Sequence, residues 1–243
     1  MILSHGNIET IAAGVMKDFN AYCEAKEKRA ISGPRFTPID QFASDYLGLK
    51  VRFLYLSDNG NFCGLTAYAD TEFQLEVDSA VLTIPLKQNE VILDSEFLEA
   101  GQTKKQYGKR RFELAHECAH QILEQLDSDQ QKTACRKMYS ERRLYSLREL
   151  KTREDWNDWQ ANSLGAAILM PWHEIEAAIV KYRIRTPLTS YGGYFNYIDR
   201  SALTTLSQFF GTSRSAMVIR LQQRGLMQIL TASEYYDPLE VWP

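Results

Sequence analysis

Two histidines and a glutamate in the stretch R-F-E-L-A-H-E-C-A-H-Q-I-L, residues 111–123, have the types and spacing that metal-dependent hydrolysis needs. On a helix, residues four apart lie one turn apart on the same face, so His116 and His120 can present two imidazole nitrogens to one ion. Glu117 can reach a water on that ion without binding it. Imidazole ligation suits Zn²⁺, and three protein ligands leave a fourth position for water. The pattern predicts a zinc site with Glu117 as general base.

The alternative is an ordinary helix that carries two histidines and no metal. The residues around the motif are apolar, which is typical of a buried helix: Phe112, Leu114, Ala115, Cys118, Ala119, Ile122 and Leu123. Burying two histidines and a glutamate there without partners would be costly, so the metal site is favoured. Cys118 lies between the histidines, but the helix turns it about 200° away from His116, and we expect it to pack in the core.

A third ligand has to come from elsewhere in the chain, because no H-E-x-x-H-x-x-G-x-x-H continuation is present. His5 and His173 are more simply explained as surface or packing residues, so we expect a carboxylate. Glu124 lies one turn beyond His120, where a third ligand from the same helix would crowd one side of the ion. A carboxylate from a second helix closes a tetrahedron more easily, and residues 154–171 predict such a helix.

The remaining elements predict an α+β fold that is mostly helical with a small, partly antiparallel sheet. Apolar residues at helical spacing predict helices at about 4–27, 111–126, 129–149, 154–170, 173–182 and two more near 199–225. Residues 37–56 predict a short helix, a stop at Gly48 and a strand, and the runs 62–69, 79–86 and 89–94 predict further strands. The basic stretch 104–111 is expected to be a solvated loop, with contact to an anionic substrate or partner as the alternative. We expect a division into residues 1–185 and a C-terminal helical segment, 186–243.

Composition limits the classes of protein. A chain of 243 residues can bury a real core without disulfides, and its net charge of -3 argues against a wholly basic nucleic-acid binder. We find no signal peptide and no apolar run of about 18 residues, so no membrane span is expected. The four cysteines show no C-x-x-C spacing, which favours reduced thiols in a cytoplasmic protein.

Two linked motifs resemble the ImmA/IrrE family of metallopeptidases. Residues 110–123, R-R-F-E-L-A-H-E-C-A-H-Q-I-L, are similar to the family's R-F-x-x-A-H-E-x-x-H helix, and residues 158–171, D-W-Q-A-N-S-L-G-A-A-I-L-M-P, to its E-x-x-A-N-x-F-A-x-x-L-L-M-P helix. The similarity extends over residues 39–56 and 203–226. It implies a zincin-like metallopeptidase fold in which His116 and His120 bind zinc and Glu117 is the general base.

The third ligand of the family, a glutamate, falls on Asp158. This side chain is one methylene shorter, so either the two helices approach more closely or the affinity for metal drops. Glu154, one turn earlier on the same face, is the rival ligand, but the spacing from Asp158 to Ala-Asn and Leu-Met-Pro is kept. The family's asparagine falls on Asn162, whose amide could orient a ligand imidazole. The family's phenylalanine is replaced by Ser163-Leu164, which is a modest change in packing.

The resemblance implies a cytoplasmic zinc endopeptidase whose substrate is a helix-turn-helix repressor of a mobile element or stress response. Tyr191, Tyr194 and His173 are candidates for stabilising the oxyanion. The alternatives are a DNA-binding regulator with a degenerate metal site and a zinc hydrolase of another amide. Residues 201–226 predict a helix-turn-helix layout with nearby arginines suited to phosphate, namely Arg200, Arg214, Arg220 and Arg224. We favour packing or protein recognition over DNA contact for this segment.

Overall fold

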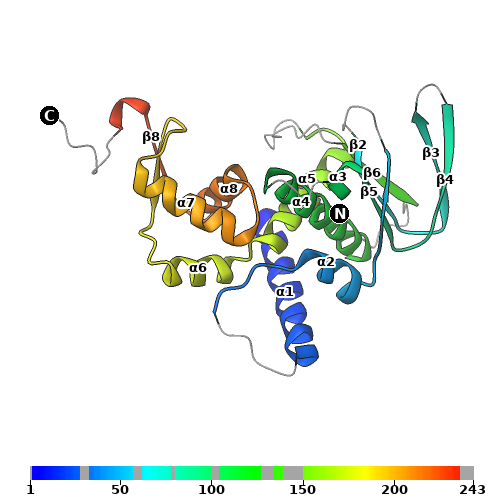
Figure 1. The fold of residues 1–243 in the computed structure, drawn as a ribbon, viewed down its shortest axis with the longest axis horizontal. Helices are drawn as coiled ribbons and strands as arrows, with labels where there is room; N and C mark the ends of the chain where they lie inside the picture. Colours follow the sequence, from blue (N-terminus) through cyan, green and yellow to red (C-terminus); the bar gives the residue numbers. More distant parts are fainter. Residues whose placement is uncertain are drawn as a thin grey trace. The chain divides into compact units, whose positions relative to one another are not determined.

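The computed structural model describes residues 2–27, 33–56, 62–77, 80–99, 104–126, 134–139 and 150–235. Tertiary contacts divide the chain into two compact units, Met1–Arg29 with Pro38–Leu169, and Ala30–Thr37 with Met170–Pro243. The fold is of the predicted α+β class (Figure 1). The two compact units divide after Leu169. The domain boundary that we expect after residue 185 stays a prediction.

The first unit contains a four-stranded sheet. Its order is β1–β5–β2–β6, with β1 (Lys50–Leu54), β5 (Glu90–Asp94), β2 (Phe62–Ala67) and β6 (Cys135–Tyr139). Strand β1 is parallel to β5, whereas β2 is antiparallel to both β5 and β6. The sheet is therefore mixed, and β2 lies in its interior with every residue buried.

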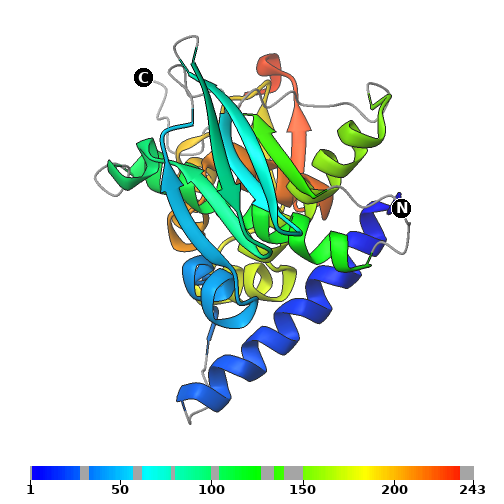
Figure 2. The same ribbon diagram turned by 90° about the vertical axis from the view of Figure 1, so that its right-hand side faces the viewer.

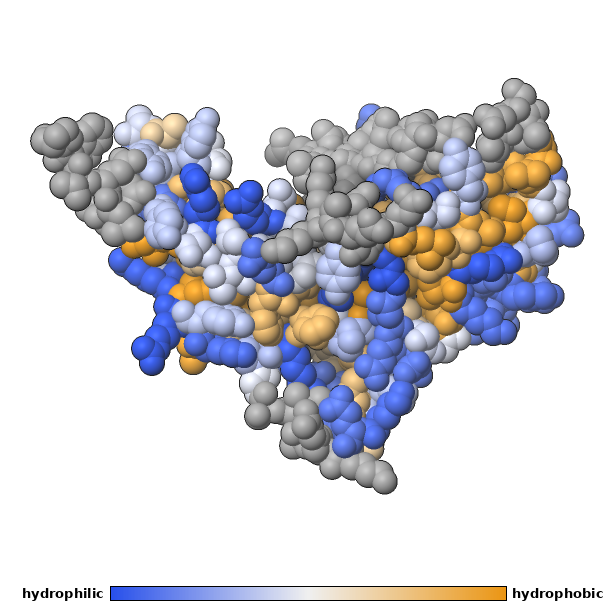
Figure 3. Space-filling view, in the orientation of Figure 1, coloured by the Kyte–Doolittle hydropathy of each residue, from blue (hydrophilic) through white to orange (hydrophobic). Residues whose placement is uncertain are grey.

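An antiparallel hairpin of β3 (Thr71–Val77) and β4 (Ala80–Leu86) packs on one face of this sheet (Figure 2). Phe73 and Ile84 belong to one buried cluster with Leu65 and Ile92 of the sheet. Strand β3 was not among the predicted strands, although its alternation of polar and apolar residues is typical of one. Apolar residues also gather on the outer surface over the hairpin (Figure 3), where Val81 is exposed.

The helices of the first unit pack together on the opposite side of the sheet, where the helix with the H-E-x-x-H motif contacts the strands directly. They are α1 (His5–Glu27), α2 (Ile39–Gln41) with a π-helical extension (Phe42–Tyr46), α3 (Glu96–Glu99), α4 (Lys104–Leu126) and α5 (Arg153–Leu169). On α4, Gln121 Nε2 donates to Thr66 Oγ1 at 2.7 Å and to the Ala67 carbonyl at 3.0 Å. Since side chains alternate along a strand, Thr66 faces α4 while Leu65 faces the hairpin. Leu3, which lies two residues before α1, donates its backbone N–H to Gln160 Oε1 of α5.

Two predicted elements are wrong. The basic stretch 104–111 is the beginning of α4, not a loop. Arg110 pairs with Asp40 and lies over the ring of Phe53, and Arg111 is buried, so tertiary contacts hold this turn in helical form. The predicted helix 129–149 contains strand β6, because pairing with β2 overrides local helix propensity. Residues 127–133 and 140–149 of that prediction lie outside the described residues.

The second unit contains α6 (Trp172–Lys181), β7 (Leu188–Tyr191), α7 (Tyr197–Phe210), α8 (Arg214–Gln223), β8 (Met227–Leu230) and a 3-10 turn (Ala232–Glu234). Asn196 caps α7 by accepting from Asp199 N, and Gly211 ends it in the left-handed conformation at φ 61°. Ser213 then caps α8, so two helices joined by a tight turn are present as predicted. The parallel pair β7–β8 was not expected. Among the described helices, none is long and apolar enough to cross a membrane.

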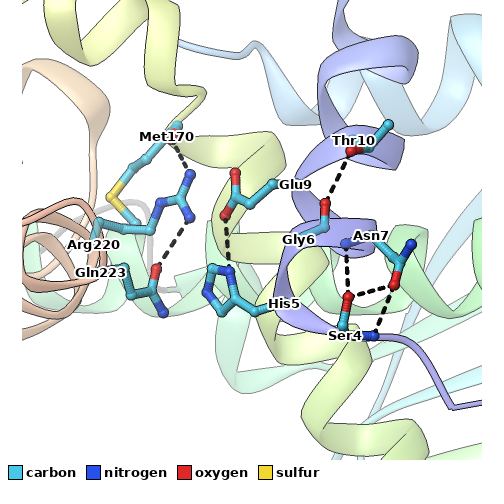
Figure 4. Close-up of polar contacts among 9 residues, drawn as sticks. All are labelled: Ser4, His5, Gly6, Asn7, Glu9, Thr10, Met170, Arg220 and Gln223. Carbon is cyan, nitrogen blue, oxygen red and sulfur yellow. Dashed lines mark hydrogen bonds and ion pairs between the residues drawn. The ribbon is translucent and has the colours of Figure 1, made fainter.

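Arg220 holds the beginning of this unit to α8. Its guanidinium donates to the carbonyl of Met170 at 3.0 Å and to Gln223 Oε1 at 3.1 Å (Figure 4), and it lies 4.2 Å from the ring centre of Trp172. Arg224 lies over the same ring and is 3.8 Å from Glu176. Arg200 donates to the carbonyl of Phe195 at 3.3 Å, so three of the four arginines considered for phosphate contact make contacts inside the unit.

Candidate metal centre

His116 and His120 on α4 and Asp158 on α5 form one group of potential ligands. One ligand atom of each side chain lies within 4.8 Å of the other two, and His120 Nε2 is 3.6 Å from Asp158 Oδ1. The two imidazole rings have centroids 4.5 Å apart and planes at 83°, as expected for neighbours one helical turn apart. Residues of α5 meet α4 in reverse order along the chain, so the two helices are antiparallel. The second helix thus brings a carboxylate to the face that carries both histidines.

The group is buried on the histidine side and open on the side of Asp158. The side chains of His116 and His120 are almost completely buried, whereas 34% of the Asp158 side chain is exposed. A tetrahedral ion with ligand bonds of about 2.1 Å separates its ligand atoms by about 3.4 Å. The separation of 3.6 Å between His120 Nε2 and Asp158 Oδ1 is close to that value. The donor set of two imidazoles and one carboxylate can hold a metal ion and leaves its open side toward Asp158.

Asn162 contacts the first histidine. Its Oδ1 lies 3.0 Å from His116 Nδ1, and a carboxamide oxygen can only accept a hydrogen bond. This contact favours the tautomer with the proton on Nδ1, which leaves the lone pair of Nε2 available to a metal. Asp158 and Asn162 are four residues apart on α5, so a single face of this helix serves both histidines.

The carboxylate of Glu117 lies in the interior of the protein. Its side chain is 1% exposed, and neither oxygen has a hydrogen-bond partner among the described residues. Burial raises the pKa of Glu117 well above its ordinary value, and the neighbouring carboxylates of Glu113 and Asp158 raise the pKa further. Burying an isolated carboxylate has a large desolvation free energy, which a nearby cation and a hydrogen-bonded water molecule would offset. The orphaned carboxylate therefore fits a metal in the adjacent ligand group.

Gly64 is a residue that the sequence reasoning missed. It lies on β2, and a Cβ built on it would stand 2.6 Å from Glu117 Oε1. No side chain larger than hydrogen fits there unless the Glu117 carboxylate moves. A signal was present, because a glycine within the apolar run F-C-G-L-T-A often marks a close approach by another group.

The other predicted site residues are not members of this ligand group. Glu154 is exposed in the first turn of α5 and does not belong to the ligand group. Tyr191, Tyr194 and His173 belong to the second unit. Tyr191 is buried against the ring of Tyr235, Tyr194 is exposed, and His173 Nε2 lies 3.2 Å from Glu174 Oε1. Their role in stabilising an oxyanion stays a prediction.

Neither the models of known protein families nor the curated proteins include a match to this chain. The arrangement of the side chains and the motifs themselves are therefore the guide to function.

Proposed function

We propose that this protein is a zincin-like, zinc-dependent endopeptidase related to the ImmA/IrrE family. The observation that carries the proposal is the unpartnered, buried carboxylate of Glu117 beside the ligand group of His116, His120 and Asp158. A structural role would require hydrogen bonds to Glu117, because a buried carboxylate without them destabilises the fold. A general base needs a free oxygen aimed at its substrate water, which is the arrangement expected of a hydrolase.

Each residue has a defined part in peptide hydrolysis. Bound zinc would supply Lewis acidity that acidifies water and polarises the scissile carbonyl. Glu117 takes the proton of the attacking water on a carboxylate oxygen and returns it to the nitrogen of the leaving amine. Its raised pKa suits a group that must hold a proton between these two transfers. Asn162 keeps His116 in the tautomer that can bind the metal.

Asp158 is the proposed third ligand in preference to Glu154. Asp158 Oδ1 is 3.6 Å from His120 Nε2, whereas Glu154 is exposed at the beginning of the helix. The exposed side of Asp158 is where a polypeptide substrate would enter. The substrate class, a helix-turn-helix repressor in the cytoplasm, follows from the family resemblance.

DNA binding through α8 has less support as a function. Arg220 is buried, and Arg224 is 3.8 Å from Glu176, so both are engaged within the unit. Specific DNA recognition needs side chains free to reach base edges and phosphates. We therefore propose that these helices serve packing or the recognition of a protein.

The test compares wild type with Glu117→Gln, using Glu124→Gln as a matched control two turns along the same helix. Zinc per chain is measured after purification without added metal, and cleavage of candidate helix-turn-helix repressors is followed by mass spectrometry. We expect zinc in all three proteins and a loss of cleavage by about 10³-fold or more in Glu117→Gln alone. A wild type that takes up no zinc, or a Glu117→Gln variant that cleaves at the wild-type rate, would contradict the proposal.

A further inference from the structure

Helix α5 approaches α4 closely at Gly165, next to the first histidine. A Cβ built on Gly165 would stand 3.1 Å from the carbonyl carbon and oxygen of Ala115 and from the backbone nitrogen of His116. Ordinary contacts of a Cβ begin at 3.4 Å. The atoms in the way are backbone atoms of a buried helix, so they cannot rotate aside as a side chain could. Any larger residue would push the two helices apart.

Gly165 lies on the same face of α5 as the residues that meet the histidines. Asp158, Asn162 and Gly165 are spaced i, i+4 and i+7, which places them along one stripe of a helix. Asn162 touches His116 and Asp158 approaches His120, so the stripe faces the site along its length. A wider helix separation at Gly165 would therefore move this stripe, and the Asp158 carboxylate with it, away from α4.

We propose that Gly165 is a positioning residue that brings α5 close enough for the short side chain of Asp158 to complete the metal site. This inference rests on the proposed zinc site. An aspartate carboxylate reaches about one carbon–carbon bond, ~1.5 Å, less far than a glutamate carboxylate would. A Cβ at position 165 would require a displacement of a few tenths of an ångström. Metal–ligand distances tolerate about 0.2 Å, so a displacement of this size affects ligation.

A double-mutant cycle tests the coupling between the two positions. The variants are Gly165→Ala, Asp158→Glu and both together, and the readout is the zinc Kd of the full chain from competition with a chromophoric chelator. We expect each single variant to weaken zinc binding by about tenfold or more, and the double variant to recover to within about threefold of wild type. Recovery in the double variant decides the question. If Gly165 served only packing, Gly165→Ala would weaken zinc binding by the same factor with aspartate or with glutamate at position 158.

Gly14→Ala is the matched control, since Gly14 is exposed on helix α1 and a Cβ there meets nothing within 4 Å. Its zinc Kd should equal that of wild type. Thermal unfolding of the metal-free proteins shows whether Gly165→Ala still folds. If it does not, Asp158→Glu alone decides: weaker zinc binding supports a site spaced for aspartate, whereas equal or tighter binding overturns the inference.

The two proposals fail in different ways. Wild-type zinc affinity in Gly165→Ala, with zinc bound by wild type, overturns the positioning role alone. An equal loss of zinc affinity from Gly165→Ala with and without Asp158→Glu overturns it as well. A wild type that binds no zinc overturns both the positioning role and the proposed peptidase.

Discussion

Gly64→Ala is the substitution that most directly tests how strand β2 shapes the site. The new Cβ would lie 2.6 Å from Glu117 Oε1, and ordinary contact begins at 3.4 Å, so the carboxylate must withdraw by about 0.8 Å. Misplacing a catalytic group by about 1 Å can cost roughly 10²-fold in rate. We therefore expect the kcat of peptide hydrolysis to fall by about 100-fold.

Zinc binding should respond much less than kcat to this change. His116 and His120 lie on the face of α4 that meets α5, and Gly64 approaches the carboxylate of Glu117. The zinc Kd of Gly64→Ala should stay within about threefold of wild type, since no ligand is displaced. In a Glu117→Gln background, Gly64→Ala should have no further effect on kcat, because the group that it displaces is no longer a base.

The assay combines single-turnover cleavage, zinc content and thermal unfolding of the same preparations. Gly14→Ala again serves as the control for a glycine substitution in open space. Full activity in Gly64→Ala would refute the argument that the glycine makes room for a catalytic carboxylate. Loss of zinc in parallel with activity would refute the separation between the base and the ligands.

Two further substitutions have defined outcomes. Asn162→Ala should weaken zinc binding by about tenfold through loss of the contact to His116 Nδ1, as measured by chelator competition, while kcat at saturating zinc changes less. Glu174→Gln should destabilise the second unit by about 1–2 kcal/mol at pH 7, measured by urea unfolding, because Arg35 N donates to its carboxylate at 2.7 Å. Burial raises the pKa of Glu174, but hydrogen bonds from His173 and Arg35 outweigh it and lower the pKa below the ordinary 4.5. The ionised Glu174 carboxylate thus stabilises the folded state above pH 4.5, and this stabilisation is lost as the pH falls through the lower pKa of the folded state. The difference in unfolding free energy between wild type and Glu174→Gln should therefore shrink on acidification, and a difference that grows would contradict this.

Helices were the part of the fold most accessible to sequence reasoning. The helices predicted at 4–27, 154–170 and 173–182 correspond to α1, α5 and α6, because each has regular apolar spacing over several turns. Strand β6 was missed because its conformation depends on pairing with β2, which no local pattern reveals. The beginning of α4 was missed for a similar reason, since Arg110 is held by Asp40, a residue 70 positions away.

In the candidate site, too, some features follow from local spacing and others depend on contacts between distant segments. The i, i+4 spacing of His116 and His120 is a local property, so the sequence could predict that both side chains share a face. The choice between Asp158 and Glu154 depended on the resemblance, and the structure brings Asp158 to the histidines while Glu154 is exposed. The roles of Gly64 and Gly165 depend on contacts between distant segments, and they appear only once the sheet and the helix pair are assembled.

The two glycines show why the H-E-x-x-H spacing by itself does not make a site. Gly64 leaves room for the carboxylate of Glu117 on the strand side of α4, and Gly165 lets α5 approach the backbone of the same helix. Neither has a side chain, and in the proposed site each would influence the position of a different carboxylate. We expect the histidines to keep their spacing with alanine at either position, whereas the proposed base or the proposed third ligand would be displaced. The chemistry that we propose for the motif therefore requires β2 and α5 to approach α4 closely, and glycine at positions 64 and 165 permits this approach.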